Sequence, residues 1–177
     1  MKKRVFSTLF AVLITVSAFA GNPFSITSGK KNLKQIFTDK ATAVISIDWS
    51  NAKYDNKKEL KAELGGDYEF VVKDCLENFI EKFNEESKGL CVSDKAERAK
   101  YKIQINVTNM DSYFAAMRFI PQYEGKVWGS MVITSLETGE TLAEIKIDEA
   151  EDGADSVKKE CYGETFGKMA KRTAKLK

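Results

Sequence analysis

Few residues in this chain could carry out acid–base or covalent chemistry. Histidine is absent from all 177 residues. This excludes Ser-His-Asp and Cys-His catalysis, His-ligated zinc and histidine pH switches. The remaining catalytic candidates are three carboxylates expected near one end of the predicted sheet: Asp48, Asp111 and Glu124. Two carboxylates about 5 to 10 Å apart can hydrolyse a glycosidic bond, but no pattern places two of these face to face. We therefore predict no enzyme activity, no cofactor and no metal.

Three cysteines give an odd number for disulfide pairing: Cys75, Cys91 and Cys161. At 1.5 Å per residue, Cys75 lies about 12 Å along the first long predicted helix, and Cys161 about 7.5 Å along the last. If both helices start at the same end, Cys75 and Cys161 could form a disulfide, whereas Cys91 lies beyond the first helix. The favoured alternative is that the two are small buried apolar residues that never bond. A nucleophilic cysteine is disfavoured because no histidine is present to activate it.

Two charged segments resemble ligand motifs without meeting their requirements. The acidic run "DEAEDGADS" (148–156) places Ala150 and Lys159 where a calcium loop needs an oxygen ligand and a glutamate. It is predicted to be a solvated linker. The basic residues between 168 and 177 fall at the end of a predicted helix, where cations suit the helix dipole. Because no aromatic residues interleave with them, we predict no nucleic-acid binding.

The first twenty residues predict export. Lys2, Lys3 and Arg4 precede an apolar run that ends in Ala18-Phe19-Ala20, which is typical of a signal peptide (1–20) cut after Ala20. The predicted mature chain has 157 residues, enough for one domain with a core. It keeps 25 of the 28 basic residues against 26 acidic ones, a net charge of −1. No later stretch is apolar enough to span a bilayer, so we predict a periplasmic or secreted protein.

Hydrophobic periodicity predicts one α+β domain over residues 41–177, after a poorly ordered lead-in at 21–40. Alternating apolar and polar residues predict four strands, and three- and four-residue spacing predicts two long helices. The strands cover 41–49, 101–110, 123–136 and 141–149, and the helices cover 67–89 and 156–177. The order β-α-β-β-β-α predicts a two-layer sandwich, in which a four-stranded mixed sheet carries both helices on one face.

This topology places the segment 109–125, a predicted loop rich in aromatic residues, beside both helix starts. Such a rim could bind a ligand, and its candidate ligand-binding residues are Trp49, Tyr113, Phe114 and Phe119. The favoured alternative is that the aromatics of this loop cap the core. The other sheet face should be open to water, with Gln104, Asn106 and Trp128 as its candidate binding residues.

The stretches "AKYKIQINVTNMD" and "GKVWGSMVITSLETGETLAEIKI", followed by a Lys-rich helix, carry a resemblance over residues 41–175. The chain resembles small uncharacterised secreted proteins of Bacteroidetes type. More loosely, it is similar to the amino-terminal domain of TolB-type proteins and related envelope lipoprotein domains, which share an acidic-Thr-Gly turn like Glu137-Thr138-Gly139. The resemblance implies an envelope binding or assembly module.

From these patterns we predict an exported, non-enzymatic module whose partner is an unidentified envelope protein or a small ligand. The first alternative is a binder of a small amphipathic molecule, such as a glycan or a lipid fragment. The second is a carboxylate-based hydrolase.

Overall fold

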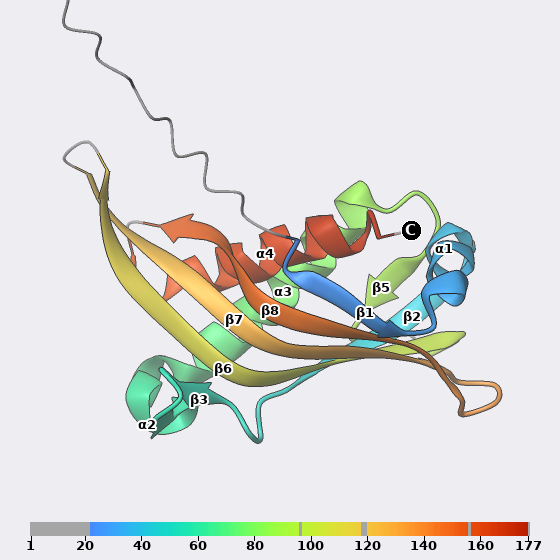
Figure 1. The fold of residues 1–177 in the computed structure, drawn as a ribbon, viewed down its shortest axis with the longest axis horizontal. Coiled ribbons are helices and arrows are strands. Elements are labelled where there is room, and N and C mark those ends of the chain that lie inside the picture. The colour runs from blue at the N-terminus through green and yellow to red at the C-terminus, as the bar shows by residue number, and fades with distance from the viewer. Residues whose placement is uncertain (1–21, 96, 118–119, 156, 177) are drawn as a thin grey trace, which may run out of the picture.

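The computed structural model describes residues 22–95, 97–117, 120–155 and 157–176. Its described strands form one eight-stranded mixed sheet, with helices packed on it (Figure 1). The elements in chain order are β1 (Phe24–Ser28), α1 (Lys30–Thr38), β2 (Thr42–Asp48), β3 (Lys53–Tyr54), β4 (Lys58–Glu59), α2 (Leu60–Leu64), the 3-10 helix η1 (Gly65–Asp67), α3 (Tyr68–Glu86), β5 (Cys91–Ser93), β6 (Tyr101–Met117), β7 (Ile120–Ser135), β8 (Thr141–Asp155) and α4 (Glu160–Thr173).

The main path of the sheet runs in the order β1-β8-β7-β6-β2-β5. Strand β2 is parallel to β6, as the predicted crossover through a helix requires, and β6, β7 and β8 form an antiparallel meander. Strand β5 adds to β2 in parallel, and β1 adds to β8 in antiparallel orientation. The short pair β3–β4 joins the sheet through β6.

The predicted four-stranded sheet with two helices is wrong, although the α+β class holds. The structure adds β1, β5 and the β3–β4 pair to the predicted strands, and it adds helix α1. Helix α2 falls within residues 57–64, whose sequence, ended by Gly65-Gly66, favours two turns of helix. Within the segment expected to be a poorly ordered lead-in, residues 24–38 form β1 and α1, joined by Gly29. These added strands have two to five residues each. Strands this short show no clear alternation of apolar and polar residues in the sequence. Their formation depends on hydrogen bonding to a neighbouring strand.

The predicted aromatic loop at 109–125 is also wrong, because strands β6 and β7 continue through it. Their pairing shifts register once, at Val107–Asn109, and then runs on to Met117 opposite Ile120. Strand β8 follows them as far as Asp155, opposite Tyr123, so residues 150–155 form a strand where an acidic linker was predicted. We call residues 111–124 of this hairpin, with the paired end of β8, the arm. Figure 1 shows it curving past the helices at one end of the sheet.

The two long helices lie side by side on one face of the sheet and run in the same direction, as predicted (Figure 1). Near their starts, the Lys159 ammonium lies 3.3 Å from the Asp67 carboxylate, and near their ends Lys175 lies 3.1 Å from Glu86. The core fills the space between this helical layer and the sheet. Its largest fully buried side chains include Phe79, Phe83, Tyr162, Phe166, Ile103, Ile105 and Met131.

Candidate functional site

The arm leaves the domain where α3 and α4 begin, and we call this end of the molecule the rim. A group of hydroxyls fixes the arm to α4: the Tyr162 hydroxyl donates to Ser112 Oγ at 3.0 Å, and the Tyr54 hydroxyl lies 3.2 Å from the same oxygen. Burial raises the pKa of Tyr162, so this phenol stays neutral and acts in hydrogen bonding. The base of the arm is therefore held to the helical layer.

A close backbone approach reinforces this attachment. Gly125 of β7 is buried against α4, and a Cβ at this position would lie 2.4 Å from Thr165 Oγ1 and 3.0 Å from the Cys161 carbonyl oxygen. Only glycine leaves room for the strand to lie this close to the helix. The arm thus projects from a rigid support.

Exposed apolar side chains gather at the rim. Among the described residues, five large apolar side chains are exposed, and four of them lie here: Phe70 (44%), Tyr113 (40%), Phe114 (58%) and Val157 (40%). Leu136, the fifth, lies at the β7–β8 turn, outside the rim. The rim therefore concentrates the exposed apolar surface of the described chain.

A ring contact, a strand pairing and a cation–ring contact place part of this surface at the same end of the molecule. The Phe114 and Tyr123 rings meet edge to face, with centroids 5.6 Å apart. Tyr123 pairs with Asp155, two residues before Val157, and the Lys159 ammonium lies 4.9 Å from the Phe70 ring centroid. Because Ser112 faces α4, Phe114 two residues later points to that same side. We call Phe70, Phe114, Tyr123 and Val157 the rim patch.

The three described residues among the predicted ligand-binding set, Trp49, Tyr113 and Phe114, do not form one site. Tyr113 points to the opposite face of the arm from Phe114, where its hydroxyl contacts Glu124 and the Lys126 ammonium lies 5.0 Å from its ring centroid. Phe119 lies outside the described residues. Because Phe114 is exposed, it does not cap the core, which was the favoured alternative.

Trp49 belongs to a separate hollow. It is half-buried, and its ring centroid lies 5.6 Å from that of Phe166. With Tyr68 and residues of α2 it lines an open depression of about 510 Å³. No described contact links this depression to the aromatics of the arm.

Of the three candidate carboxylates, Asp48 on β2 lies apart from the other two. Asp48 Oδ1 accepts the Ser50 backbone N–H at 2.9 Å, and this bond lowers the pKa of Asp48. Asp111 is opposite Lys126 and Glu124 is opposite Tyr113 in the β6–β7 ladder, so Asp111 and Glu124 are diagonal neighbours on one face of the arm. None of the three lines the hollows described in this section. Over the described residues, no three Cys, Asp or Glu side chains group as a metal site would require.

The predicted open face of the sheet carries Gln104, Asn106 and Trp128, all of them half-exposed. Gln104 Nε2 donates to Asn106 Oδ1 at 2.8 Å, and Asn106 Nδ2 donates to Ser130 Oγ at 3.3 Å. Trp128 points to this face because successive side chains of a strand alternate between the two faces, and its neighbour Val127 is buried on the core face. The side-chain amides of Gln104 and Asn106 thus hydrogen bond to each other and to Ser130 on this face.

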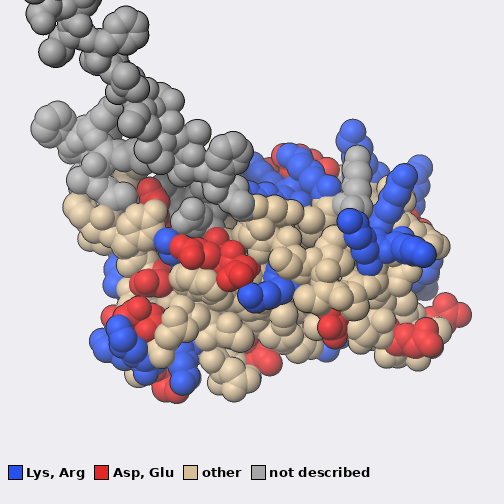
Figure 2. All heavy atoms as spheres, viewed as in Figure 1, with Lys and Arg blue, Asp and Glu red and all other residues tan. Residues whose placement is uncertain are grey.

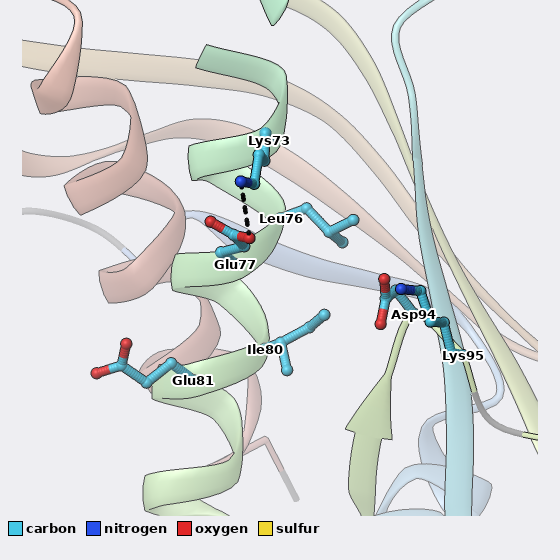
Figure 3. Close-up of a pocket in the computed structure, with 7 residues that line it drawn as sticks. All are labelled: Lys73, Leu76, Glu77, Ile80, Glu81, Asp94 and Lys95. Carbon is cyan, nitrogen blue, oxygen red and sulfur yellow. Dashed lines mark ion pairs between the residues drawn. The ribbon is translucent and has the colours of Figure 1, made fainter. Parts of the chain in front are cut away.

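A shallow groove of about 530 Å³ separates α3 from the turn after β5 (Figure 3). Leu76 and Ile80 point from α3 toward Asp94 and Lys95 across the groove. On the helix, Lys73 and Glu77 form an ion pair at 3.7 Å. The groove is lined by two lysines and three acidic residues, so its charge favours neither an anionic nor a cationic ligand.

All three cysteines are free thiols in the structure. Cys75 and Cys161 are buried, Cys161 Sγ contacts the Lys158 carbonyl oxygen at 2.9 Å, and burial raises the pKa of Cys75 well above its usual value. A buried thiol with a raised pKa is a poor nucleophile. Cys91 is exposed on β5, away from the other two in the fold.

Comparisons with known proteins give distant structural likenesses. No protein-family model and no curated protein matches the chain. One solved structure, the PelC dodecamer from Paraburkholderia phytofirmans, is similar with a TM-score of 0.45 and 9% identity, covering 84% of this chain and 96% of that one. A single-substitution variant of that dodecamer gives a TM-score of 0.40 and 9% identity, covering 85% and 95%. The resemblance to Bacteroidetes secreted proteins and TolB-type domains stays a prediction. Within the described residues, no helix combines the length and the apolarity needed to cross a membrane.

Sequence reasoning found Phe114 but missed the other members of the rim patch. Phe70 lies outside the apolar stripe of α3, and an aromatic on the charged side of an amphipathic helix was a usable signal. Val157 falls within the predicted last helix (156–177), but α4 begins only at Glu160 and Val157 is exposed. Tyr123 was predicted to be the first residue of a strand, so its contact with Phe114 was not foreseen.

Proposed function

We propose that this chain is an exported, non-enzymatic module that binds a protein partner through the rim patch. One observation carries the proposal: three of the five exposed large apolar side chains of the described residues, Phe70, Phe114 and Val157, belong to the rim patch, at the end where an arm projects beyond the domain. Exposed apolar side chains gathered on one part of a protein surface are typical of an interaction site. Aromatic anchors on a rigid support also lose little side-chain entropy on binding.

The shape of the rim favours a protein partner over the small ligand considered from the sequence. The rim patch lines none of the hollows described above, while Trp49 lines a separate depression. The hollow closest to the helix starts, lined by Glu63, Leu64, Asp67, Lys158, Lys159 and Tyr162, measures only about 180 Å³. Small-molecule sites are concave and enclose most of their ligand. A projecting patch suits a partner that brings its own pocket.

A paired substitution tests this proposal. The double variant Phe70→Ser/Phe114→Ser removes two exposed anchors, and Leu136→Ser removes an equally exposed apolar side chain outside the rim. Immobilised wild type, double variant and control are each incubated with a secreted and envelope extract from the source cells, and bound proteins are quantified by mass spectrometry. We expect a partner retained by wild type and Leu136→Ser but depleted at least about tenfold by the double variant. Equal retention by all three chains would refute the proposal.

A further inference from the structure

Another hollow lies at the opposite end of the helical layer, which we call the basal end. Here α1, α3 and α4 all terminate around a cavity of about 420 Å³, within the range of small-molecule sites. The floor is apolar, and ammonium groups stand at the mouth. The residues that line it are Lys34, Phe37, Thr38, Glu86, Lys88, Ala174, Lys175 and Leu176. Figure 2 shows Lys and Arg side chains standing close together over this end.

The walls of this basal pocket are fixed by backbone packing. Gly89 lies so close to α1 that a Cβ there would be 2.6 Å from the Thr38 carbonyl carbon. The Leu90 N–H donates to the Phe37 carbonyl at 3.4 Å, and the Phe37 and Phe83 ring centroids are 5.9 Å apart. The pocket is therefore formed before any ligand arrives.

The charge at the mouth is unbalanced. Lys175 pairs with Glu86 at 3.1 Å, but within the described part of the chain Lys34 and Lys88 make no ion pair. The helix ends themselves carry partial negative charge, which favours cations there. The backbone N–H groups of Asp39, Ser87 and Ala174 donate hydrogen bonds to carbonyls of the last helical turns. These bonds offset part of the negative charge at the helix ends. Two ammonium groups remain for a ligand.

We propose that the basal pocket binds a small single-chain amphiphile with an anionic head. Its apolar tail lies on Phe37, Ala174 and Leu176, and its carboxylate or phosphate head meets Lys34 and Lys88. This site is independent of the rim patch, so either proposal can fail without the other. A free fatty carboxylate and a phosphate-bearing lipid fragment share this chemistry.

To test this proposal, the mature chain is titrated with four probes, and binding is followed by calorimetry and two-dimensional NMR. Three probes are amphiphiles with a ten-carbon tail, and the fourth is a lipid vesicle. Decanoate and decyl phosphate supply the two anionic heads, decyltrimethylammonium supplies a cationic one, and phosphatidylglycerol vesicles supply a membrane surface. We expect one saturable site for at least one anionic probe, with binding about tenfold or more stronger than for the cationic probe and weakened by salt. Amide shifts should centre on residues 34–38, 86–88 and 174–176. Binding by decyl phosphate alone would assign the source as a phosphate head, and by decanoate alone as a free carboxylate.

Matched variants separate head from tail recognition. Lys34→Gln/Lys88→Gln should weaken the anionic probe about tenfold, whereas Lys95→Gln, an exposed lysine of the groove beside α3, should leave it unchanged. Leu176→Ser should lower the affinity for all the probes that bind, and by the same factor for each, because it removes contacts to the shared apolar tail. The proposal is overturned if the cationic probe binds equally well, if Lys95→Gln weakens binding as much, if shifts map elsewhere, or if only vesicles bind.

Discussion

The two ends of the helical layer present apolar surface in opposite shapes. At the rim, Phe114 and Phe70 stand out from the surface, on a projecting arm and on the first turn of a helix. At the basal end, Phe37 and Leu176 lie within a hollow whose mouth carries lysines. The same helices make both ends, because α3 and α4 run in parallel and so place both starts at one end and both terminations at the other.

Parallel packing of the two helices therefore accounts for the two different surfaces. Where the helices start, the sheet continues past them and exposes its aromatic residues. Where they end, the chain turns back tightly through Gly89 and encloses a cavity instead. Four perturbations, described below in decreasing order of effect, test this difference between the ends.

The largest effect is expected from the core that joins the two ends. Phe166 is fully buried and contacts Trp49, so Phe166→Ala should lower the free energy of unfolding by about 3 to 5 kcal/mol. Urea unfolding followed by tryptophan fluorescence and by far-ultraviolet circular dichroism measures the change. Coincident transitions are expected, because both ends share one core. Two separated transitions would show that the ends fold as independent units.

A smaller effect is expected where the arm meets α4. Gly125→Ala places a Cβ against Thr165 and the Cys161 backbone, and should cost about 1 to 3 kcal/mol. The control is Gly66→Ala, because a Cβ there meets nothing within 4 Å. Gly125→Ala should also weaken partner capture at the rim without changing amphiphile binding at the basal end. An equal loss at both ends would contradict the separation.

A still smaller, pH-dependent effect is expected at the helix interface. Burial, with the nearby Glu160, raises the pKa of Asp74, so the folded state holds this proton more tightly than the unfolded chain does. Stability should therefore fall as pH rises above the usual value of 3.8, by less than about 1 kcal/mol because Asp74 is partly solvated.

Asp74→Asn should remove that slope, as measured by unfolding midpoints between pH 3.5 and 7. Glu81 provides a control of opposite sign, since a hydrogen bond from Lys82 lowers its pKa. Its stabilisation is present above its usual 4.5 and is lost as pH falls, so Glu81→Gln should reduce stability only at the higher pH. An unchanged profile for Asp74→Asn would contradict the raised pKa.

The smallest expected effect is that of a reducing agent, which should leave the unfolding midpoint unchanged. All three cysteines are free in the structure, with Cys75 and Cys161 buried and Cys91 exposed. A thiol reagent should label one site quickly in the native chain and three after denaturation. A count of one in the denatured, unreduced chain would instead show that two cysteines are bonded, and a label found on Cys91 would identify the Cys75–Cys161 disulfide considered from the sequence.

Much of the fold's framework could be predicted from periodicity. Alternation in 101–107 and 141–147 identified β6 and β8, and the apolar stripe from Val71 to Phe83 identified α3. Chain order then gave the parallel β2–β6 pair and the shared direction of the helices. Strands β3, β4 and β5 were missed because two- and three-residue strands have no period and form only where a partner supplies hydrogen bonds. The five-residue strand β1 was missed because its segment was predicted to be a poorly ordered lead-in.

The arm was missed for a different reason. The register shift at Val107–Asn109 moves the inward positions by one residue, so that Met110 is buried where simple alternation predicts an outward side chain. A strict two-residue alternation no longer fits the sequence after this bulge, so the strand was predicted to end here and a loop to follow. Of the rim patch, only Phe114 was foreseen, because exposure of Phe70 and Val157 depends on where α3 and α4 begin relative to the arm.

The support that the domain gives to the arm decreases along its length. At Ser112, opposite Gly125, the hairpin packs on α4 and β7 pairs with β8. At Phe114, opposite Tyr123, β8 still pairs with β7 but ends there, at Asp155. A partner bound at Phe114 would add contacts where the domain supplies fewer, so amide exchange at the described residues of β6 around Phe114 should slow when the partner binds.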